Sequence, residues 1–356
     1  MKREGLILSK ILQISKDPFC CYIRLTAIKE DCRKIDNNIF ILAFKFYFRK
    51  EFQSGISFNS CTLLMSNKIS TRLRSMKLTQ QKLLPKVLMW ILIICWNTSL
   101  IAQVKISSWN LQNFGKSKLD QEIKFIASSL EEFDIIAIQE VVAGYGGTQA
   151  VARLAIALSN KGTKWSYVTS EPTNSKPYGT ERYAYIWKTG KIKKVRHAWL
   201  EQFYVNEIDR EPFMINFSYK GTEFTLVSFH AIPKKKQPET EIKYLKFLPT
   251  QYPDKNLIFL GDFNLPQSHT VFNPLKKRGY KSAFYAQKTT MKMHCVAEEC
   301  LANEYDNIFY NTNTTQILKH GIVPFYECFA DMVAARRISD HIPIWAEFIF
   351  PSAGVQ

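Results

Sequence analysis

Residues 257–266 read Leu-Ile-Phe-Leu-Gly-Asp-Phe-Asn-Leu-Pro, and this stretch organises the rest of the chain. Four consecutive apolar residues predict a buried strand, and Gly261 predicts a sharp turn behind it. Asp262 and Asn264 stand at alternate positions at the carboxyl end of that strand, where open α/β sheets place their sites. A carboxylate and an amide so placed can share a hard cation or a phosphate oxygen. An ordinary capped turn is the competing interpretation, because both residues favour turns.

The charge of the chain is unevenly distributed. The 356 residues allow one large domain or two ordinary ones, and the net charge is +17. Residues 1–102 hold 17 Lys/Arg and 6 Asp/Glu, and so account for +11 of that charge. Most of the excess therefore lies outside the part that carries the chemistry, and net charge is a weak indicator of a nucleic-acid partner.

Residues 76–102 show the pattern of a secretory signal peptide. A basic segment, 76–86, precedes ten apolar residues, 87–96, and Ala102 supplies the small residue of a cleavage site. The apolar run is too short to span a bilayer, which needs about 20 residues. We predict a secreted or periplasmic protein with no stable membrane association once processed. An uncleaved anchor is the alternative.

A signal peptide belongs at the N-terminus, yet 75 residues precede this one. We therefore expect Met76 to be the biological start, and residues 1–75 to be an over-extended translation or an unstructured segment. A small N-terminal domain or a second membrane segment is the alternative. The catalytic domain is predicted to occupy residues 103–356 and to be a monomer.

From residue 104 onward, short apolar runs alternate with amphipathic segments. Strands are predicted over residues 104–109, 134–140, 165–169, 183–187, 213–218, 224–230, 257–260, 305–310 and 342–348. Helices are predicted over 119–133, 151–158, near 239–248 and in a piece that ends at Gly279, and glycines 144, 146 and 147 predict a loop. The pattern indicates an α/β (α+β) domain of about 250 residues, in which two sheets carry helices on their outer faces.

Polar residues stand where these predicted strands end. They are Asn110, Glu140, Glu181, His230, Asp262, Asn264, Asp306, Asp340 and His341. Taken singly, each has an ordinary explanation, such as a turn cap, a loop carboxylate or a structural histidine. Together they bring acids, amides and two of the six histidines to strand ends, which few structural accidents do.

These residues lie in motifs that resemble those of the endonuclease/exonuclease/phosphatase superfamily, the metal-dependent phosphoesterases with a deoxyribonuclease I-like fold. The motifs are Ser108-Trp-Asn110, Ile138-Gln-Glu140, Ser228-Phe-His230, Gly261-Asp-Phe-Asn264, Tyr305-Asp306 and Ser339-Asp-His341, in family order. The resemblance implies a four-layer sandwich of two packed mixed β-sheets flanked by helices. Two further segments, 170–183 and 209–212, are similar to those of the secreted, pancreatic-type deoxyribonucleases.

The resemblance also implies a metal site. Glu140 with Asn110 would hold Mg²⁺ or Mn²⁺ through oxygen ligands, which these ions prefer. Asp340 would support a second metal, and a structural Ca²⁺ is left open.

The catalytic roles implied by the resemblance agree with the chemistry of phosphodiester hydrolysis. The reaction needs an activated water, neutralisation of developing charge and protonation of the leaving oxygen. Asp262 and Asn264 would orient the water and the scissile phosphate. The two histidines would be acid and base, in an order that the sequence does not settle. Their orienting partners would be Glu181 for His230 and Asp306 for His341.

Substrate contacts are predicted outside the metal set. Arg210 would hold a DNA phosphate, unless it forms a surface ion pair with Asp209 or Glu211. Tyr178 is a second substrate-binding candidate, whereas Val142 stands where the deoxyribonuclease branch often has a basic residue. Residues 234–236, three lysines just after His230, are either a basic rim for phosphate or a solvated charge run.

Cysteine usage is consistent with export. After the predicted signal only Cys295, Cys300 and Cys328 remain. In an oxidising compartment, Cys295 and Cys300 are expected to close a small loop and to leave Cys328 outside the bridge. The spacing does not suit a zinc site, which needs a further Cys/His pair.

Three functions compete on this sequence. The first is a secreted, metal-dependent endonuclease that acts on DNA with little sequence preference. The second is a phosphodiesterase of the same superfamily on a lipid head group, such as a sphingomyelinase, which should carry an exposed aromatic hairpin. The third is a binding or toxin-like module with a decayed site. Inositol-phosphate phosphatases are disfavoured, because Asn307 stands where they place a basic residue.

Overall fold

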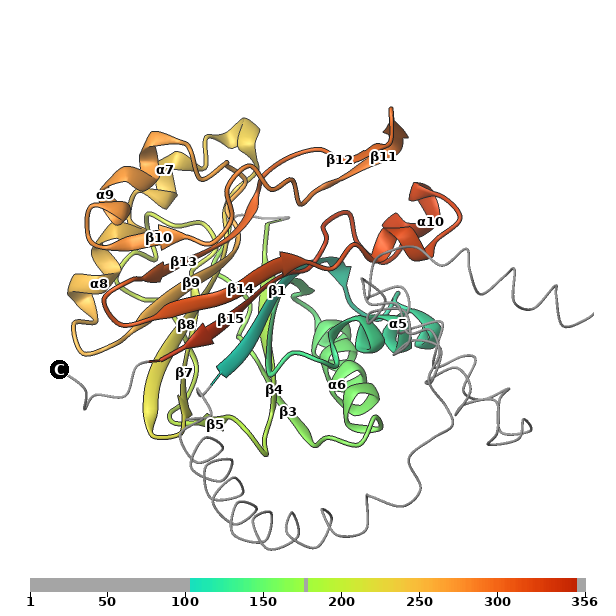
Figure 1. Cartoon of the computed structure of the whole chain (residues 1–356), viewed down its shortest axis with the longest axis horizontal. Coiled ribbons are helices and arrows are strands. Elements are labelled where there is room, and N and C mark those ends of the chain that lie inside the picture. The colour runs from blue at the N-terminus through green and yellow to red at the C-terminus, as the bar shows by residue number, and fades with distance from the viewer. Residues whose placement is uncertain (1–102, 176–178, 351–356) are drawn as a thin grey trace, which may run out of the picture. The chain divides into compact units, whose positions relative to one another are not determined.

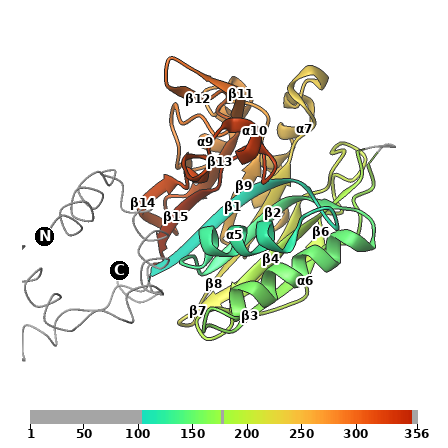
Figure 2. The same cartoon turned by 90° about the vertical axis from the view of Figure 1, so that its right-hand side faces the viewer.

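Two packed β-sheets form the described part of the chain, residues 103–175 and 179–350 of the computed structural model (Figures 1 and 2). The first sheet has the strand order β14-β15-β1-β2-β4-β3. The second has the order β10-β13-β9-β8-β7-β5, and β6 pairs with β7. The predicted signal peptide, the segment before it and Tyr178 lie outside the described residues.

The strands of both sheets are short and mixed in direction. The first sheet holds β1 (Gln103–Phe114), β2 (Ile135–Val142), β3 (Trp165–Thr169), β4 (Glu181–Lys188), β14 (Gln316–Ile322) and β15 (Ile344–Ile349). The second holds β5 (Lys193–Lys194), β6 (Trp199–Leu200), β7 (Phe213–Tyr219), β8 (Thr222–His230), β9 (Leu257–Asp262), β10 (Tyr280–Ser282) and β13 (Asp306–Asn311). Each sheet contains one parallel pair, β1 with β2 and β8 with β9.

Helices cover the outer faces of the sheets. The helices α5 (Asp120–Leu130) and α6 (Tyr145–Ser159) lie side by side over the first sheet (Figure 2). Over the second sheet lie short helices, some of them 3-10 turns. They are η2 (Lys234–Lys236), α7 (Glu239–Ile242), η3 (Leu245–Phe247), α8 (Leu248–Gln251), η4 (Thr270–Phe272) and α9 (Asn273–Lys276). Near the C-terminal end, η5 (Phe325–Cys328) and α10 (Met332–Arg336) precede β15. The described residues thus confirm the predicted sandwich with helical outer layers.

Alternation along the strands separates three apolar layers. In β2, Ile136 and Ile138 pack under α5 and α6, whereas Ile135 and Ala137 pack between the two sheets. In β9, Ile258 and Leu260 face the space between the sheets, and the residues between them face the short helices. Successive side chains of a strand point to opposite faces, so a strand buried on both faces needs an unbroken apolar run. That requirement explains the run at 257–260.

Gly261 does not form the predicted turn. It continues β9, with φ at +138°, and pairs with Asn307 of β13. A Cβ atom on Gly261 would lie 2.0 Å from the main-chain oxygen of Phe229, so only glycine permits β8 and β9 to lie this close. The chain turns instead at Asn264, which has a left-handed backbone with φ at +51°.

Three further expectations about elements were wrong. The helix expected near 239–248 is broken into α7, η3 and α8, and Pro249, in the first turn of α8, cannot donate to Leu245 as an unbroken helix would need. The loop expected at glycines 144–147 is the first turn of α6, where Gly147 packs against the main chain of Val142. Strand β14 was not predicted, because most of its residues are partly or fully exposed and apolar alternation is absent. Among the described residues, no helix has the length and apolar character needed to cross a membrane.

Candidate active site

The polar strand ends meet where the two sheets face each other. Asn110 and Glu140 lie on the neighbouring parallel strands β1 and β2, and His230 and Asp262 lie on the neighbouring parallel strands β8 and β9. The Asn110 amide nitrogen donates to Glu140 Oε1 at 3.0 Å and to Asp262 Oδ2 at 3.2 Å. This one amide therefore joins the polar end of the first sheet to that of the second.

His230 is held by a carboxylate from the opposite sheet. Its Nδ1 lies 3.0 Å and 2.9 Å from the two carboxylate oxygens of Glu181, at the start of β4, and both side chains are buried. Burial disfavours the Glu181 carboxylate, but the charges of His230 and Arg210 outweigh burial and lower its pKa. Burial likewise disfavours protonated His230, and the Glu181 charge outweighs it and raises the pKa of the imidazole. Each group of the pair therefore shifts the pKa of the other in the direction that favours an ion pair.

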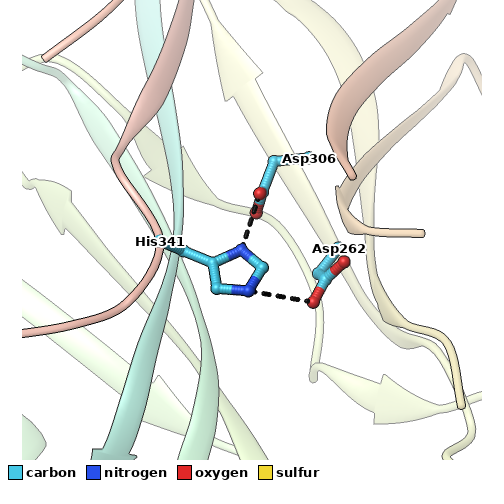
Figure 3. Close-up of side chains that lie close together, drawn as sticks. All are labelled: Asp262, Asp306 and His341. Carbon is cyan, nitrogen blue, oxygen red and sulfur yellow. Dashed lines mark hydrogen bonds and ion pairs between the residues drawn. The ribbon is translucent and has the colours of Figure 1, made fainter. Parts of the chain in front are cut away.

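His341 forms a second pair of the same kind (Figure 3). Its Nδ1 lies 2.7 Å from Asp306 Oδ2, and its Nε2 lies 3.7 Å from Asp262 Oδ2. Burial opposes protonation, but the charges of Asp306 and Asp262 prevail and raise the pKa of His341 to about 10. The Nε2 of His230 lies 3.5 Å from the same Asp262 oxygen. The imidazoles of His230 and His341 thus both approach the buried carboxylate of Asp262. A second carboxylate holds each imidazole at its Nδ1 atom.

Asp262 is oriented by the turn that follows β9. The main-chain nitrogen of Asn264 donates to Asp262 Oδ1 at 2.9 Å, and its side-chain amide donates to the main-chain oxygen of Ala231 at 2.9 Å. Burial disfavours the Asp262 carboxylate, yet the two histidine charges lower its pKa. Residues 261–264 therefore supply one carboxylate acceptor, Asp262, at the centre of the site. They also supply one amide, that of Asn264, which holds the main chain just after His230.

The side chains of Asn110 and Glu140 fit a divalent cation. The Asn110 Oδ1 atom is buried and has no hydrogen-bond partner, which is costly unless a cation or water satisfies it. Glu140 has a left-handed backbone with φ at +58°, and its Oε2 accepts from the main-chain nitrogen of Asn113 at 3.2 Å. Such a conformation is unusual for a non-glycine residue and is typical of functional sites. An amide oxygen and a carboxylate are suitable ligands for Mg²⁺ or Mn²⁺.

A second group has the composition of a metal site. Donor atoms of Asp262, Asp306 and His341 lie within 4.8 Å of one another, and all three residues are buried (Figure 3). These residues could hold a metal ion, but His341 Nδ1 is already bonded to Asp306. A metal there would have to compete with that bond. Asn110 Oδ1 and Asp306 Oδ1 are both buried without a hydrogen-bond partner, so each of the two groups offers one oxygen to an ion, and only the Asn110–Glu140 pair does so without an imidazole bond to compete with.

Asp340 is held by contacts with residues that were not predicted to belong to the site. Its Oδ2 accepts from the Gln112 amide at 3.1 Å and lies 3.6 Å from the Arg336 guanidinium. Its neighbour Ser339 donates to the main-chain oxygen of Asn110 at 2.6 Å, so this segment is tied to the end of β1. The buried Lys118 ammonium donates at 2.7 Å to the main-chain oxygens of residues 337 and 338, just before Ser339. A role of Asp340 toward a second metal remains a prediction.

Arg210 is buried, so the alternative of a surface ion pair is wrong. Only 8% of the residue is exposed, and its Nη1 lies 3.1 Å from Glu181 Oε2. Its Nη2 donates to the main-chain oxygen of Ala231. Arg210 therefore stands behind the Glu181–His230 pair rather than apart from the catalytic residues. The sequence could not show this, since Glu181 lies 29 residues earlier on the other sheet. The phosphate contact itself remains a prediction.

Two hydroxyl groups support the histidine pairs and were missed in the sequence. Thr289 Oγ1 donates to Asp306 Oδ2 at 2.6 Å, and the Asp306 main-chain nitrogen donates back to that hydroxyl at 3.0 Å. The Tyr183 hydroxyl accepts from the main-chain nitrogen of His230 at 3.2 Å. Tyr183 lies in the segment 170–183 but was given no role there, and no local pattern marks Thr289.

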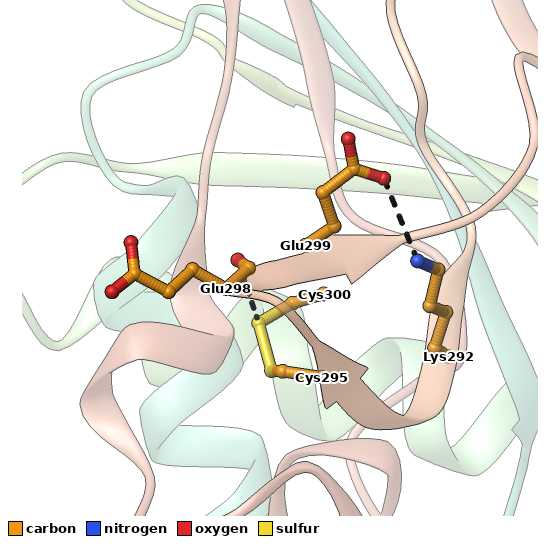
Figure 4. The surroundings of a disulfide bond; sticks show 5 residues. All are labelled: Lys292, Cys295, Glu298, Glu299 and Cys300. Carbon is orange, nitrogen blue, oxygen red and sulfur yellow. Dashed lines mark hydrogen bonds and ion pairs between the residues drawn. A yellow bond between two sulfur atoms is a disulfide. The ribbon is translucent and has the colours of Figure 1, made fainter.

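The predicted disulfide is confirmed. Cys295 and Cys300 are bonded in the hairpin formed by β11 (Met291–Val296) and β12 (Glu299–Leu301), shown in Figure 4. The hairpin leaves the site directly, because Thr290 forms a bridge with His341. Cys328 is exposed, outside this bond.

Known proteins share this sequence pattern and this fold. The Endonuclease/Exonuclease/phosphatase family matches residues 107–341. A deoxyribonuclease of Thioalkalivibrio sp. (strain K90mix) is 27% identical over 288 residues, which cover 72% of this chain and 74% of that protein. Deoxyribonuclease-1 of Gallus gallus is 29% identical over 189 residues, 48% of this chain and 64% of that protein, which is less than two thirds of its length.

Solved structures agree on the fold. An endonuclease/exonuclease/phosphatase family protein from Bacteroides thetaiotaomicron has a TM-score of 0.53 at 16% identity, covering 70% of this chain and 98% of that one. A mannosyl-6-phosphatase of the same species has a TM-score of 0.52 at 18% identity, covering 69% and 100%. At such identities the likeness shows the fold alone. The match over residues 107–341 goes further, and this chain belongs to the endonuclease/exonuclease/phosphatase family, whose members are hydrolases of phosphoester bonds.

Proposed function

We propose that this protein is a divalent-metal-dependent endonuclease that hydrolyses phosphodiester bonds in DNA with little sequence preference. The proposal rests mainly on one observation, the two buried histidine–carboxylate pairs that approach Asp262 from opposite sheets. The deoxyribonuclease relatives support DNA as the substrate class. Catalytic residues that act on the phosphate also favour low sequence preference, because phosphates carry no sequence information.

The histidine pairs are suited to moving protons during hydrolysis. In each, Nδ1 is bonded to a carboxylate, which leaves Nε2 to exchange a proton with the reacting groups. One imidazole takes the proton of the attacking water as the new P–O bond forms. The other gives a proton to the leaving oxygen as its bond to phosphorus breaks. Exchange with solvent then restores both imidazoles, so that no net proton is gained or lost by the protein.

The remaining site residues hold this arrangement in place. Asp262 Oδ2 lies within 3.7 Å of both Nε2 atoms, and it can position the water between them. Asn110 and Glu140 would hold the divalent ion, which when bound neutralises charge that develops on the phosphate. Glu181 and Asp306 fix the tautomer and orientation of the two imidazoles.

Purified protein assayed on plasmid DNA, RNA and sphingomyelin, with and without Mg²⁺, tests the proposal. We expect nicking of the plasmid that needs the ion and that Glu140→Ala reduces by orders of magnitude. Unchanged circular dichroism of the variant would show that the fold survives. Hydrolysis of sphingomyelin without cleavage of DNA would contradict the proposal and favour a lipid phosphodiesterase.

We further propose that the protein is exported and that its signal peptide spans residues 76–102. The sequence pattern supports this, and so does the Cys295–Cys300 bond, because disulfides persist in oxidising compartments. In the native host, the mature chain should begin near Gln103 and be found outside the cytoplasm. Recovery of residues 1–75 in the exported protein, by intact mass or N-terminal sequencing, would contradict the proposal.

A further inference from the structure

Three exposed lysines follow His230 in the turn η2 (Lys234–Lys236), which we call the lysine turn. None of the ion pairs among the described residues includes one of them. Six other lysines of the described chain do form ion pairs, as Lys191 does with Asp134 at 2.6 Å. The lysine turn therefore presents three ammonium groups whose charges no carboxylate of the described chain neutralises by direct contact.

The lysine turn is fixed relative to the catalytic centre. The main-chain oxygen of Ala231 accepts from both Arg210 and Asn264, and the main-chain nitrogen of Ile232 donates to the buried Glu241 at 2.6 Å. Within the turn, the main-chain nitrogen of Lys236 donates a hydrogen bond to the main-chain oxygen of Pro233. The four residue steps from His230 to Lys234 span at most about 14 Å, even when fully extended.

A basic rim beside the catalytic centre would favour the binding of a polyanionic substrate. The centre is lined by carboxylates, of which Glu181, Asp262 and Asp306 are buried. A polyanion also carries phosphates outside the bond being cleaved, and these phosphates need cationic partners beyond the catalytic centre. Each strand of a duplex carries one phosphate per about 3.4 Å of helix axis, so the distance from His230 to the lysine turn corresponds to at most about four phosphates.

We propose that the lysine turn is a binding site for the DNA backbone flanking the scissile bond. This inference rests on the proposed endonuclease function and adds to it a contact for phosphates that are not cleaved. A 3-10 turn has three residues per turn, so the three side chains spread in different directions. One strand can therefore meet one or two of the ammonium groups at a time, and the contact is independent of base sequence.

The test replaces all three lysines and measures binding against salt. In the Lys234→Ala/Lys235→Ala/Lys236→Ala variant of the full chain, the slope of log Kd against log salt should fall by about one to two units. Each lost phosphate contact should weaken binding roughly eight-fold at 0.1 M salt, since each contributes a slope of about 0.9. KM for plasmid DNA should rise with little change in kcat. Turnover of bis(p-nitrophenyl) phosphate, which is too small to reach the turn, should be unchanged.

A control variant with the same loss of charge separates a local contact from a general effect. Lys193→Ala/Lys194→Ala/Lys319→Ala removes three exposed lysines, two of them on β5, which pairs with the end of β7 farther from Phe213. Its salt slope should stay within about 0.3 units of the unchanged chain, on the scale of about 0.9 units per contact. An equal fall in both variants, or no fall in the lysine-turn variant, would overturn the inference. Loss of binding to vesicles of anionic lipid, with DNA binding intact, would also overturn it.

The proposed function and this inference fail in different ways. If the unchanged chain neither binds nor cleaves DNA, the endonuclease proposal is refuted and the inference falls with it. If the unchanged chain cleaves DNA and the lysine-turn variant matches it in slope and KM, only the inference is refuted.

Discussion

Replacing Arg210 by alanine tests whether this residue belongs to the catalytic centre. The substitution removes an ion pair with Glu181 in which both side chains are 9% exposed. Breaking a buried pair by removing one partner costs about 3–5 kcal/mol, because the other charge is left uncompensated. Here Glu181 keeps its bond to His230, and the main-chain oxygen of Ala231 keeps its bond to Asn264. We therefore expect the low end of that range, about 3 kcal/mol in the free energy of unfolding.

Thermal and denaturant unfolding give the first measurement. For a domain of this size, about 3 kcal/mol corresponds to a fall in Tm of about 6 to 12 °C. Arg210→Lys is the matched control, because it keeps the charge but cannot reach both acceptors with a rigid guanidinium, and it should recover part of the loss.

Activity gives the second measurement. Because Arg210 bears on Glu181 and so on His230, hydrolysis of DNA and of bis(p-nitrophenyl) phosphate should fall together. The Arg210 charge also lowers the pKa of His230, so its removal should move the limb of the kcat/KM profile that His230 sets to higher pH. An unchanged Tm with a loss confined to DNA binding would refute the placement of Arg210 behind the catalytic pair and restore a surface phosphate contact.

Three further outcomes follow from the contacts described above. Chelation should abolish hydrolysis, and Glu140→Ala should weaken Mn²⁺ binding measured by calorimetry, whereas full activity in excess chelator would exclude the metal site. Glu181→Gln removes the charge that raises the pKa of His230, so the limb of the kcat/KM profile that His230 sets should move to lower pH. A profile in which neither limb moves would show that the protonation of His230 does not control the reaction. Lys118→Met leaves the main-chain oxygens of residues 337 and 338 without their donor, and the free energy of unfolding, measured in urea, should fall by about 1–3 kcal/mol for each oxygen. Lys116→Met replaces an exposed lysine nearby and should leave the free energy of unfolding almost unchanged.

Much of the fold could be predicted because buried strands have a clear local pattern. The apolar runs at 135–138 and 257–260 indicate burial on both faces, and the structure confirms both strands. Strand β14 has no such pattern, since its stability comes from pairing with β15 rather than from its own apolar residues. Gly261 shows the same limit, because the neighbour that excludes a side chain there is Phe229, on a different strand.

In the candidate site, too, some residues could be predicted from the sequence and others could not. The residues that end strands were found from their positions, and the structure brings Asn110, Glu140, His230, Asp262, Asp306 and His341 together. The supporting contacts were not found, because they join residues far apart in sequence. Thr289 reaches Asp306 over 17 residues, and Gln112 reaches Asp340 over 228. The burial of Arg210 depends on a partner from the other sheet, and no local pattern carries that information.

The order of the strands has a consequence for how the protein is made. The first sheet combines β1 and β2 from the beginning of the domain with β14 and β15 from its end, and Gln103 pairs with Ile349. His341 immediately precedes β15, so a growing chain lacks one of its two histidine pairs until nearly all of the domain has been synthesised. A growing chain that has not yet reached β15 therefore carries no complete site. If the protein is a nuclease, the nucleic acids around the ribosome are protected by the topology of the fold itself until the last strand is in place.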